Sequence, residues 1–228
     1  MLLKFLSGWL VAPSASTFGP QIDHLYNLVL WITGIAFVLT EVALIVFSIR
    51  YRQRPGQKAL YSHGSTQAEI IWTAVPAAIL VYLGFLSQSL WSELRVPQNF
   101  PKPALLVKVQ AEQWLWHFKF AGPDGQFGTD DDITVENTFH VPVDQVVQFE
   151  VTSQDVIHGF YIPDLRIHQD VVPGMVSKLW VQPNKLGTYD VRCTQFCGTN
   201  HYQMKGQIVV DTPADFQAWL ASSKAAAF

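Results

Sequence analysis

Two long apolar runs occupy the first part of the chain. The run from Leu25 to Phe47 contains one charged residue, Glu41, and the run from Ile70 to Leu90 contains none. Each run approaches the roughly 20 residues that a helix needs to cross a bilayer. Core helices of a soluble protein would keep a polar face, and neither run has one. The pattern therefore predicts two transmembrane helices, over residues 25–50 and 69–92.

The segment between the two runs sets their orientation. No acidic residue precedes Glu69 there, whereas four basic residues are present: Arg50, Arg52, Arg54 and Lys58. Lysine and arginine are enriched in loops on the cytoplasmic side of a membrane. Residues 22–95 are therefore expected to form a helical hairpin with a cytoplasmic loop, and both termini are expected on the periplasmic side.

The first residues, 1–21, are expected to form a separate N-terminal segment. Lys4, a short apolar stretch and the small residues from Ala12 to Ala15 give this segment some likeness to a signal peptide. We expect it to be retained in the protein as a short interfacial helix followed by a polar loop.

The pattern changes after Val96-Pro97, where short segments with apolar residues at every second position alternate with turn residues. Six such segments stand out: 105–111, 114–120, 146–152, 176–181, 187–192 and 206–210. Strands at this spacing predict a sandwich or a small barrel. Thr212-Pro213 predicts the start of a short closing helix, because Thr caps a helix and Pro is favoured at its first position. Residues 96–228 are therefore expected to form one all-β domain with a C-terminal helix.

Composition and charge narrow the function. Charged residues make up 14% of the chain, against about 25% in an average soluble domain, which agrees with membrane segments. The formal net charge of −3 argues against a nucleic-acid partner, because no basic face would neutralise phosphates. The sequence contains no CxxCH motif, so covalently attached haem c is not expected.

The two cysteines belong to a cluster of soft metal ligands. Cys193, Cys197, His201 and Met204 fall within one short segment, and a disulfide between cysteines so close in sequence would close a cramped loop. Thiolate, thioether and imidazole together select copper, and Met is a poor ligand for the alternative, zinc. A mononuclear copper site would need one Cys, whereas two thiolates can bridge two metal ions. A second imidazole is then required, and His158, which alone would be read as an ordinary partly buried histidine, is the candidate.

His158 followed by Cys-x3-Cys-x3-His-x2-Met resembles the copper signature of cytochrome c oxidase subunit II. The segment from Glu69 to Thr73 and the aromatic run from Gln113 to Trp116 resemble the same family, and the resemblance extends over about Asp23 to Val210. It implies an α+β membrane protein with an N-terminal two-helix transmembrane hairpin and an all-β cupredoxin-like domain.

The resemblance also implies a role for each ligand of a dinuclear copper centre, CuA. Two thiolates, Cys193 and Cys197, would bridge the coppers. The terminal and axial ligands would be His158, His201, Met204 and the main-chain carbonyl of Gln195. Most relatives have Glu at this last position, where its side chain also reaches a magnesium ion shared with the large subunit. The neutral Gln195 weakens the case for that magnesium site.

The function that the resemblance implies is electron transfer. A c-type cytochrome would dock on the periplasmic side, and CuA would pass its electrons to haem in subunit I. The haems and CuB of that subunit would reduce oxygen to water, coupled to proton pumping. Trp114 would be the residue at which electrons arrive, and we expect it at the surface, although it is otherwise one position of an ordinary strand. Glu69 is either an acidic residue favoured in a first helical turn or the entrance of a proton path.

The expected partners are oxidase subunits I and III, a c-type cytochrome and the lipid bilayer, with the plasma membrane of a bacterium as the location. Nitrous oxide reductase carries a similar copper motif but needs a large His-rich domain and no hairpin, and quinol oxidase subunit II lacks the copper ligands. A free-standing electron carrier or copper-delivery module is the non-enzyme alternative. The segment 122–132 looks like a calcium loop but lacks the EF-hand spacing, so we expect a solvated turn.

Overall fold

The computed structural model describes residues 13–59 and 61–226, which form two compact units. One unit is Asp23–Leu90, and the other combines the chain from Trp91 onward with the segment that ends at Ile22. The expected interfacial helix falls on residues 1–12, outside the described residues.

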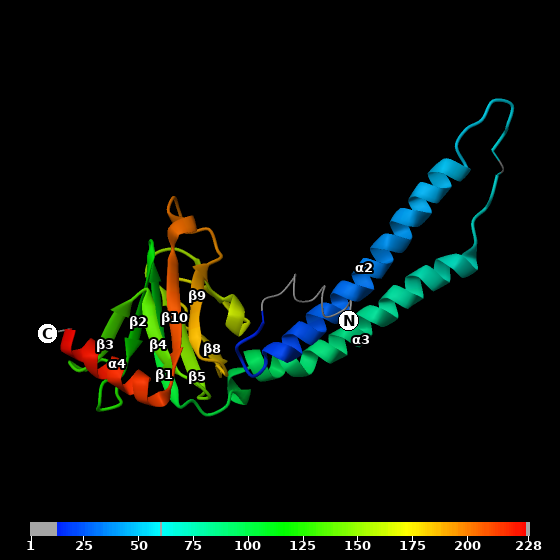
Figure 1. Ribbon diagram of the computed structural model, residues 1–228. Coiled ribbons are helices and arrows are strands. Elements are labelled where there is room, and N and C mark those ends of the chain that lie inside the picture. Colours follow the sequence, from blue (N-terminus) through cyan, green and yellow to red (C-terminus); the bar gives the residue numbers. More distant parts are fainter. Residues whose placement is uncertain (1–12, 60, 227–228) are drawn as a thin grey trace. The chain divides into compact units, whose positions relative to one another are not determined.

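Two long helices make up the first unit (Figure 1). Helix α2 covers Gly19–Arg50 and helix α3 covers Thr66–Arg95, with 32 and 30 residues. Both are long and apolar enough to span a membrane. Their large apolar side chains are exposed, for example Leu39 and Phe85, as expected of helices that face lipid. Helix α3 begins after Ser65, whose hydroxyl accepts a hydrogen bond from the Ala68 N–H.

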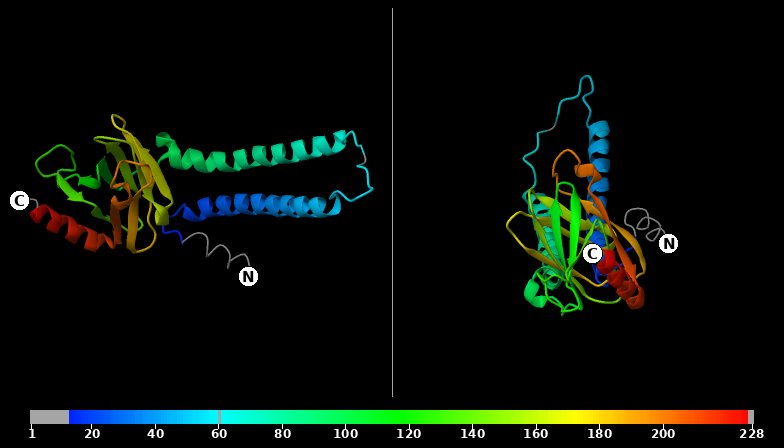
Figure 2. Two further views of the ribbon diagram at one scale, coloured as in Figure 1. Left: turned by 90° about the horizontal axis from the view of Figure 1, so that it is seen from above. Right: turned by 90° about the vertical axis from the view of Figure 1, so that its left-hand side faces the viewer.

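The second unit contains two five-stranded sheets with their inner faces packed together (Figures 1 and 2). The first has the order β3-β2-β1-β5-β8 and the second β4-β10-β9-β6-β7. The strands are β1 Leu105–Glu112, β2 Leu115–Phe120, β3 Ile133–Glu136, β4 Thr138–Pro142, β5 Val147–Ser153, β6 His158–Ile162, β7 Ile167–Val171, β8 Ser177–Val181, β9 Gly187–Cys193 and β10 Lys205–Asp211. All six predicted strands are confirmed within a residue or two at each end, and β3, β4, β6 and β7 were not predicted.

Aromatic side chains fill the space between the sheets. Phe118 from one sheet stacks on Phe139 from the other with ring centroids 3.9 Å apart, and Phe149 and Phe160 pack around them. The predicted alternation holds for β2, since Trp116, Phe118 and Phe120 all point inward and are buried. This rigid core holds the ends of β6 and β9, from which the candidate site is built.

Two terminal segments complete this unit. The polar loop expected before α2 is tied to the sheets, because the Ser16 hydroxyl donates to the Leu165 carbonyl at 2.9 Å and Phe18 packs against Trp180. Helix α4, Pro213–Ala226, begins at the predicted cap, where the Thr212 hydroxyl accepts from the Asp215 N–H at 3.2 Å. The predicted closing helix is therefore confirmed.

Candidate metal centre

His158 opens strand β6 and is completely buried. Its Nδ1 atom lies 3.2 Å from the Met204 sulfur, and its Nε2 atom lies 2.9 Å from a carboxylate oxygen of Asp155. A carboxylate on one imidazole nitrogen fixes the ring and leaves the other nitrogen free to bind a metal ion. Sequence reasoning missed this contact, for which the one available signal was an Asp three residues before the histidine.

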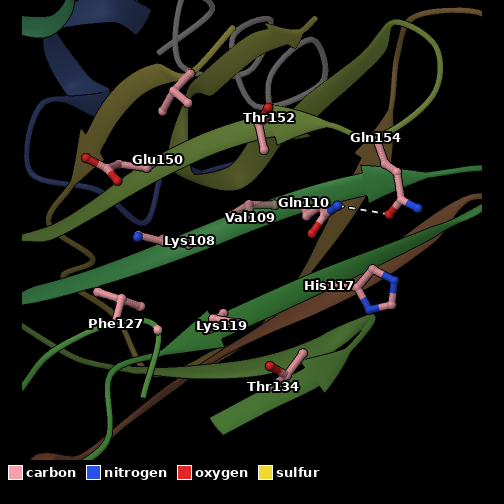
Figure 3. A pocket seen from close by; sticks show the side chains of 12 residues that line it. Lys108, Val109, Gln110, His117, Lys119, Phe127, Thr134, Glu150, Thr152 and Gln154 are labelled. Atoms are coloured by element: carbon pink, nitrogen blue, oxygen red, sulfur yellow. Dashed lines mark hydrogen bonds between the residues drawn. The ribbon is translucent and has the colours of Figure 1, made fainter. Parts of the chain in front are cut away.

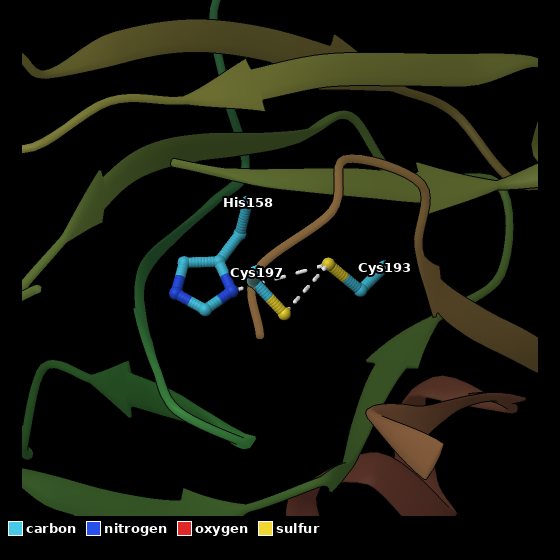
Figure 4. A group of neighbouring side chains, drawn as sticks. All are labelled: His158, Cys193 and Cys197. Atoms are coloured by element: carbon cyan, nitrogen blue, oxygen red, sulfur yellow. Dashed lines mark hydrogen bonds between the residues drawn. The ribbon is translucent and has the colours of Figure 1, made fainter. Parts of the chain in front are cut away.

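The two thiols face each other at the end of strand β9. Strands β9 and β10 are antiparallel neighbours, and the 194–204 loop connects the end of β9 to the start of β10. The Cys193 and Cys197 sulfurs lie 3.8 Å apart, well beyond the roughly 2.05 Å of a disulfide, and both cysteines are free. Figure 4 shows both thiols and the His158 ring turned toward one another.

The remaining predicted ligands converge on these two sulfurs. His201 Nδ1 lies 3.5 Å from the Cys197 sulfur, and the Met204 sulfur lies 3.8 Å from it. The Gln195 carbonyl oxygen is 3.2 Å from the Cys193 sulfur. The structure therefore brings all six candidate ligand residues together, with one imidazole beside each thiol.

The two thiols differ in pKa because their neighbours differ, although burial acts to raise the pKa of both. Burial alone would raise the pKa of Cys193, but hydrogen bonds from His158 and from the main chain outweigh it and lower the pKa to about 7. Burial and the neighbouring Cys193 charge raise the pKa of Cys197 to about 12. One thiolate is thus available at neutral pH before any metal ion binds, and a cation would displace the second proton.

The donor set fits copper. Two thiols, two imidazoles and a thioether are soft or borderline ligands, and the hard oxygen donors that magnesium and calcium prefer are absent among these six side chains apart from the Gln195 amide. Within the described part of the chain, His158, Cys193 and Cys197 form the one group of His, Cys, Asp or Glu donors close enough to share a metal ion.

Comparison with known proteins shows the family of the chain. The family model for the periplasmic domain of cytochrome c oxidase subunit II matches residues 122–212, and the model for its transmembrane domain matches residues 6–90. The alternative cytochrome c oxidase subunit 2 of Bradyrhizobium diazoefficiens is 31% identical over 98% of this chain and 87% of its own length. The chain belongs to the cytochrome c oxidase subunit II family. It is a subunit of a haem–copper oxidase, an oxidoreductase, so the expected family, fold class and enzyme class are confirmed.

Other relatives agree with the family and with the fold. Cytochrome c oxidase subunit 2 of Thermostichus vulcanus is 28% identical over 96% of this chain and 80% of its own length. The crystal structure of the periplasmic domain of subunit II of cytochrome oxidase from Bradyrhizobium japonicum matches 55% of this chain and 97% of that one. Its TM-score is 0.50 at 27% identity. Membership of this subunit II family implies a CuA centre.

Trp114, which was expected at the surface, is only partly exposed. It precedes β2 in a turn and is half-buried rather than exposed, and its indole N–H is buried without an acceptor among the described residues. The cause is Gly198, since a Cβ atom there would lie 3.3 Å from the Trp114 ring. The lack of a side chain on the 194–204 loop lets the indole sit against it.

Two other candidates lie outside the cluster. Glu69 is in the first turn of α3, in the helical unit. In the 122–132 loop, Asp124 and Asp132 accept hydrogen bonds from the loop N–H groups of Gln126 and Gly128, and Asp132 also lies 3.6 Å from the Lys119 amine. These contacts are those of a structural turn, as expected from the sequence.

A groove of about 530 Å³ crosses the outer face of the first sheet (Figure 3). Most of its charged or titratable side chains already have partners: Glu150 lies 3.1 Å from Lys178, His117 lies 3.1 Å from Glu112, and Lys119 lies 3.6 Å from Asp132. Gln110 likewise donates to Gln154. Lys108, which also lines the groove, lies over the Phe127 ring at 4.4 Å. With most of its charges paired, the groove is a weaker candidate for ligand binding than the thiol cluster.

Proposed function

We propose that His158, Cys193, Gln195, Cys197, His201 and Met204 hold a dinuclear CuA centre in this subunit II. The observation that carries the proposal is the pair of unbridged thiols 3.8 Å apart, each with its own imidazole nitrogen. When bound, the copper pair supplies a carrier of one electron at a time between a c-type cytochrome and haem in subunit I. The haems and CuB belong to that partner subunit.

The protein side chains supply rigidity and exclude water. His158, Cys197 and Met204 are buried, and each is anchored to a strand end or to the tight 194–204 loop. Every donor to the copper pair would come from the protein, so no position is left for a substrate. This donor set supports electron transfer rather than bond chemistry on this chain.

A cysteine substitution tests the proposal in the assembled oxidase. Cys193→Ser should abolish oxidation of a reduced c-type cytochrome, because one bridging thiolate is lost, while the haem content of the complex stays normal. Normal cytochrome oxidation by a Cys193→Ser complex would contradict it. Ser177→Ala, a change on strand β8 outside the ligand set, is the control and should leave the rate unchanged.

For electron arrival we propose Trp114. Its half-buried ring lies against Gly198, the residue that follows the thiol of Cys197. An aromatic ring that touches both solvent and the 194–204 loop is suited to pass electrons inward from a docked cytochrome. Phe196 and Tyr202 on the same loop expose 74% and 71% of their surfaces, and exposed apolar side chains on a binding loop are typical of a contact with another protein.

For proton uptake we propose Glu69. It lies at the end of α3 that adjoins the basic connecting segment, and an acidic side chain at this membrane boundary can take protons from the cytoplasm. Glu69→Gln should slow steady-state oxygen consumption while the rate of electron arrival from the cytochrome stays normal. An unchanged oxygen-consumption rate would rule out this role.

The partners that we propose are subunits I and III within a bacterial plasma membrane, with the β domain in the periplasm.

The composition of helix α2 supports a protein partner in the membrane. Successive residues lie roughly 100° apart around the helix axis, and this spacing puts large aliphatic residues on one side and the small and polar residues on the other. One half has only Ile32, Ile35, Val38, Leu39, Val42, Ile45, Val46 and Ile49. The other has Thr33, Gly34, Ala36, Phe37, Thr40, Glu41, Ala43, Leu44, Phe47 and Ser48. Small and polar residues are enriched where membrane helices pack together, and intramembrane acids face protein.

A further inference from the structure

Gln113 ties the turn before strand β2 to the 194–204 loop. Its side-chain amide Nε2 donates a hydrogen bond to the Cys197 carbonyl at 2.8 Å, across 84 positions of sequence. The Cys197 carbonyl belongs to the main chain that carries one of the two bridging thiols. The contact therefore fixes the turn directly to a proposed copper ligand.

The main chain of Gln113 is fixed on its other side as well. Its N–H donates to one carboxylate oxygen of Asp155 at 2.7 Å, and the other oxygen of that carboxylate lies 2.9 Å from His158 Nε2. Gln113 is thus linked to two proposed ligands, Cys197 directly and His158 through Asp155. Cys197 lies in the 194–204 loop and His158 opens strand β6, so Gln113 joins elements that the local sequence does not connect.

The residue that follows, Trp114, has no polar anchor of its own. Its indole N–H is buried without an acceptor among the described residues, and its ring rests on Gly198. Gly198 has φ +122, and a Cβ atom there would lie 2.9 Å from the Gln113 amide nitrogen and 3.3 Å from the Trp114 ring. The position of the ring therefore depends on packing and on the two hydrogen bonds of Gln113.

We propose that Gln113 is a positioning residue that holds the Trp114 indole against the 194–204 loop and so sets its distance from the thiol pair. The inference rests on the proposed role of Trp114 in electron arrival. Electron tunnelling slows steeply with distance, so a small displacement of the ring would slow transfer while the copper ligands stay unchanged.

The test compares Gln113→Met with Gln110→Met in the assembled oxidase. Methionine keeps the length of the side chain and removes its N–H donor. Gln110 is an exposed glutamine whose side chain, among the described residues, bonds to Gln154 alone. Hydroxyl-radical labelling of Trp114, read by mass spectrometry with the buried Trp116 as internal reference, reports the ring position. We expect increased Trp114 labelling and a several-fold slower reaction with the cytochrome for Gln113→Met alone. Copper content, the copper EPR spectrum and the rate with a small artificial donor should be unchanged.

The outcomes separate this inference from the proposed function. Unchanged Trp114 labelling and an unchanged cytochrome rate in Gln113→Met would overturn it, and so would loss of copper, since Gln113 would then build the copper site itself. Increased labelling of Trp114 in Gln113→Met would support the positioning contact. If Trp114→Ala then oxidised the cytochrome at the normal rate, the electron-arrival role would be overturned. If Gln113→Met does not accumulate, Gln113→Glu, which also lacks the donor, is measured in the same way.

Discussion

Gly159 and Thr194 are in direct contact across the edge of the metal centre. The Thr194 N–H donates to the Gly159 carbonyl at 3.1 Å, and a Cβ atom on Gly159 would lie 2.4 Å from the Thr194 hydroxyl oxygen and 2.9 Å from the Gln195 nitrogen. Strand β6, which carries His158, can therefore approach the 194–204 loop closely only because this position is glycine. The contact links the first ligand in the sequence to the loop that, together with the last residue of β9, holds the other five.

Gly159→Ala should push the 194–204 loop away from β6. Overpacking of this kind costs about 1–3 kcal/mol, and we expect the variant to unfold at lower denaturant concentration and to retain less copper. Gly84→Ala, where a Cβ atom meets open space, is the control and should behave like the unmodified protein. Full copper retention in Gly159→Ala would show that the loop can move without losing its ligands.

The two thiols of the metal-free protein should react at different rates. Cys193 is half-buried with its pKa lowered to about 7, whereas Cys197 is buried with its pKa raised to about 12. Because the thiolate is the nucleophile, iodoacetamide at pH 7.5 should label Cys193 first. Mass spectrometry of the time course measures the order, and equal labelling of both thiols would contradict the assigned asymmetry. Copper loading should protect both.

Asp155 should control how firmly His158 binds copper. Asp155→Asn removes the charge beside Nε2 and should lower copper affinity by about 10–100-fold, the usual effect of losing such a partner. Asp170→Asn changes an exposed carboxylate on the adjacent strand β7 and should leave affinity unchanged. Competition with a copper chelator provides the measurement, and equal affinities for the two variants would exclude the role of Asp155.

The same pair gives the metal-free protein a defined pH dependence. Burial acts to raise the pKa of Asp155, but hydrogen bonds from His158 and two main-chain N–H groups lower it overall, so its stabilising effect is lost as the pH falls through this lowered pKa. Burial acts to lower the pKa of His158, but Cys193 and Asp155 raise it overall, so its effect is lost as the pH rises through this raised pKa. The free energy of unfolding of the metal-free protein should therefore be highest between the lowered pKa of Asp155 and the raised pKa of His158, and should fall at lower and at higher pH. Asp155→Asn should make this fall smaller.

The sequence predicted much of this architecture because its signals are local. Long apolar runs with at most one charged residue marked the helices, and period-two alternation marked strands such as β1 and β5. Strand β6 was missed because it is buried at almost every position and so shows no alternation, and β3 was missed because it has only four residues. The ligand residues were visible from their chemistry and spacing, and the structure brings them together.

Contacts that depend on the tertiary fold were not predictable in this way. Gln113 bonds to Asp155 and Cys197 across 42 and 84 positions, and nothing in the local pattern pairs these residues. The half-burial of Trp114 has the same origin, because Gly198 covers it from a distant loop. The strand pattern indicated that Trp114 lies at the start of a strand. The residue that packs against it, Gly198, belongs to the loop between β9 and β10 of the other sheet.

Gln195 should affect the surroundings of the copper pair rather than its ligation. The proposed copper contact uses the main-chain carbonyl, which glutamine supplies as well as glutamate, whereas a hard cation such as magnesium prefers an anionic oxygen. Gln195 is exposed, so its side chain is available to a partner subunit. Gln195→Glu should lower the reduction potential of the copper and strengthen manganese binding to the assembled oxidase. If neither quantity changes, the Gln195 side chain does not face the partner's cation site.

The most direct test of the dinuclear centre is a copper count combined with EPR of the purified protein. Two thiols 3.8 Å apart with one imidazole each predict two coppers per chain and a seven-line spectrum from one electron shared by both. Cys197→Ser should lose the shared-electron spectrum, whereas Met204→Leu should keep most of the copper and shift its potential. One copper per chain with a four-line spectrum would contradict the account.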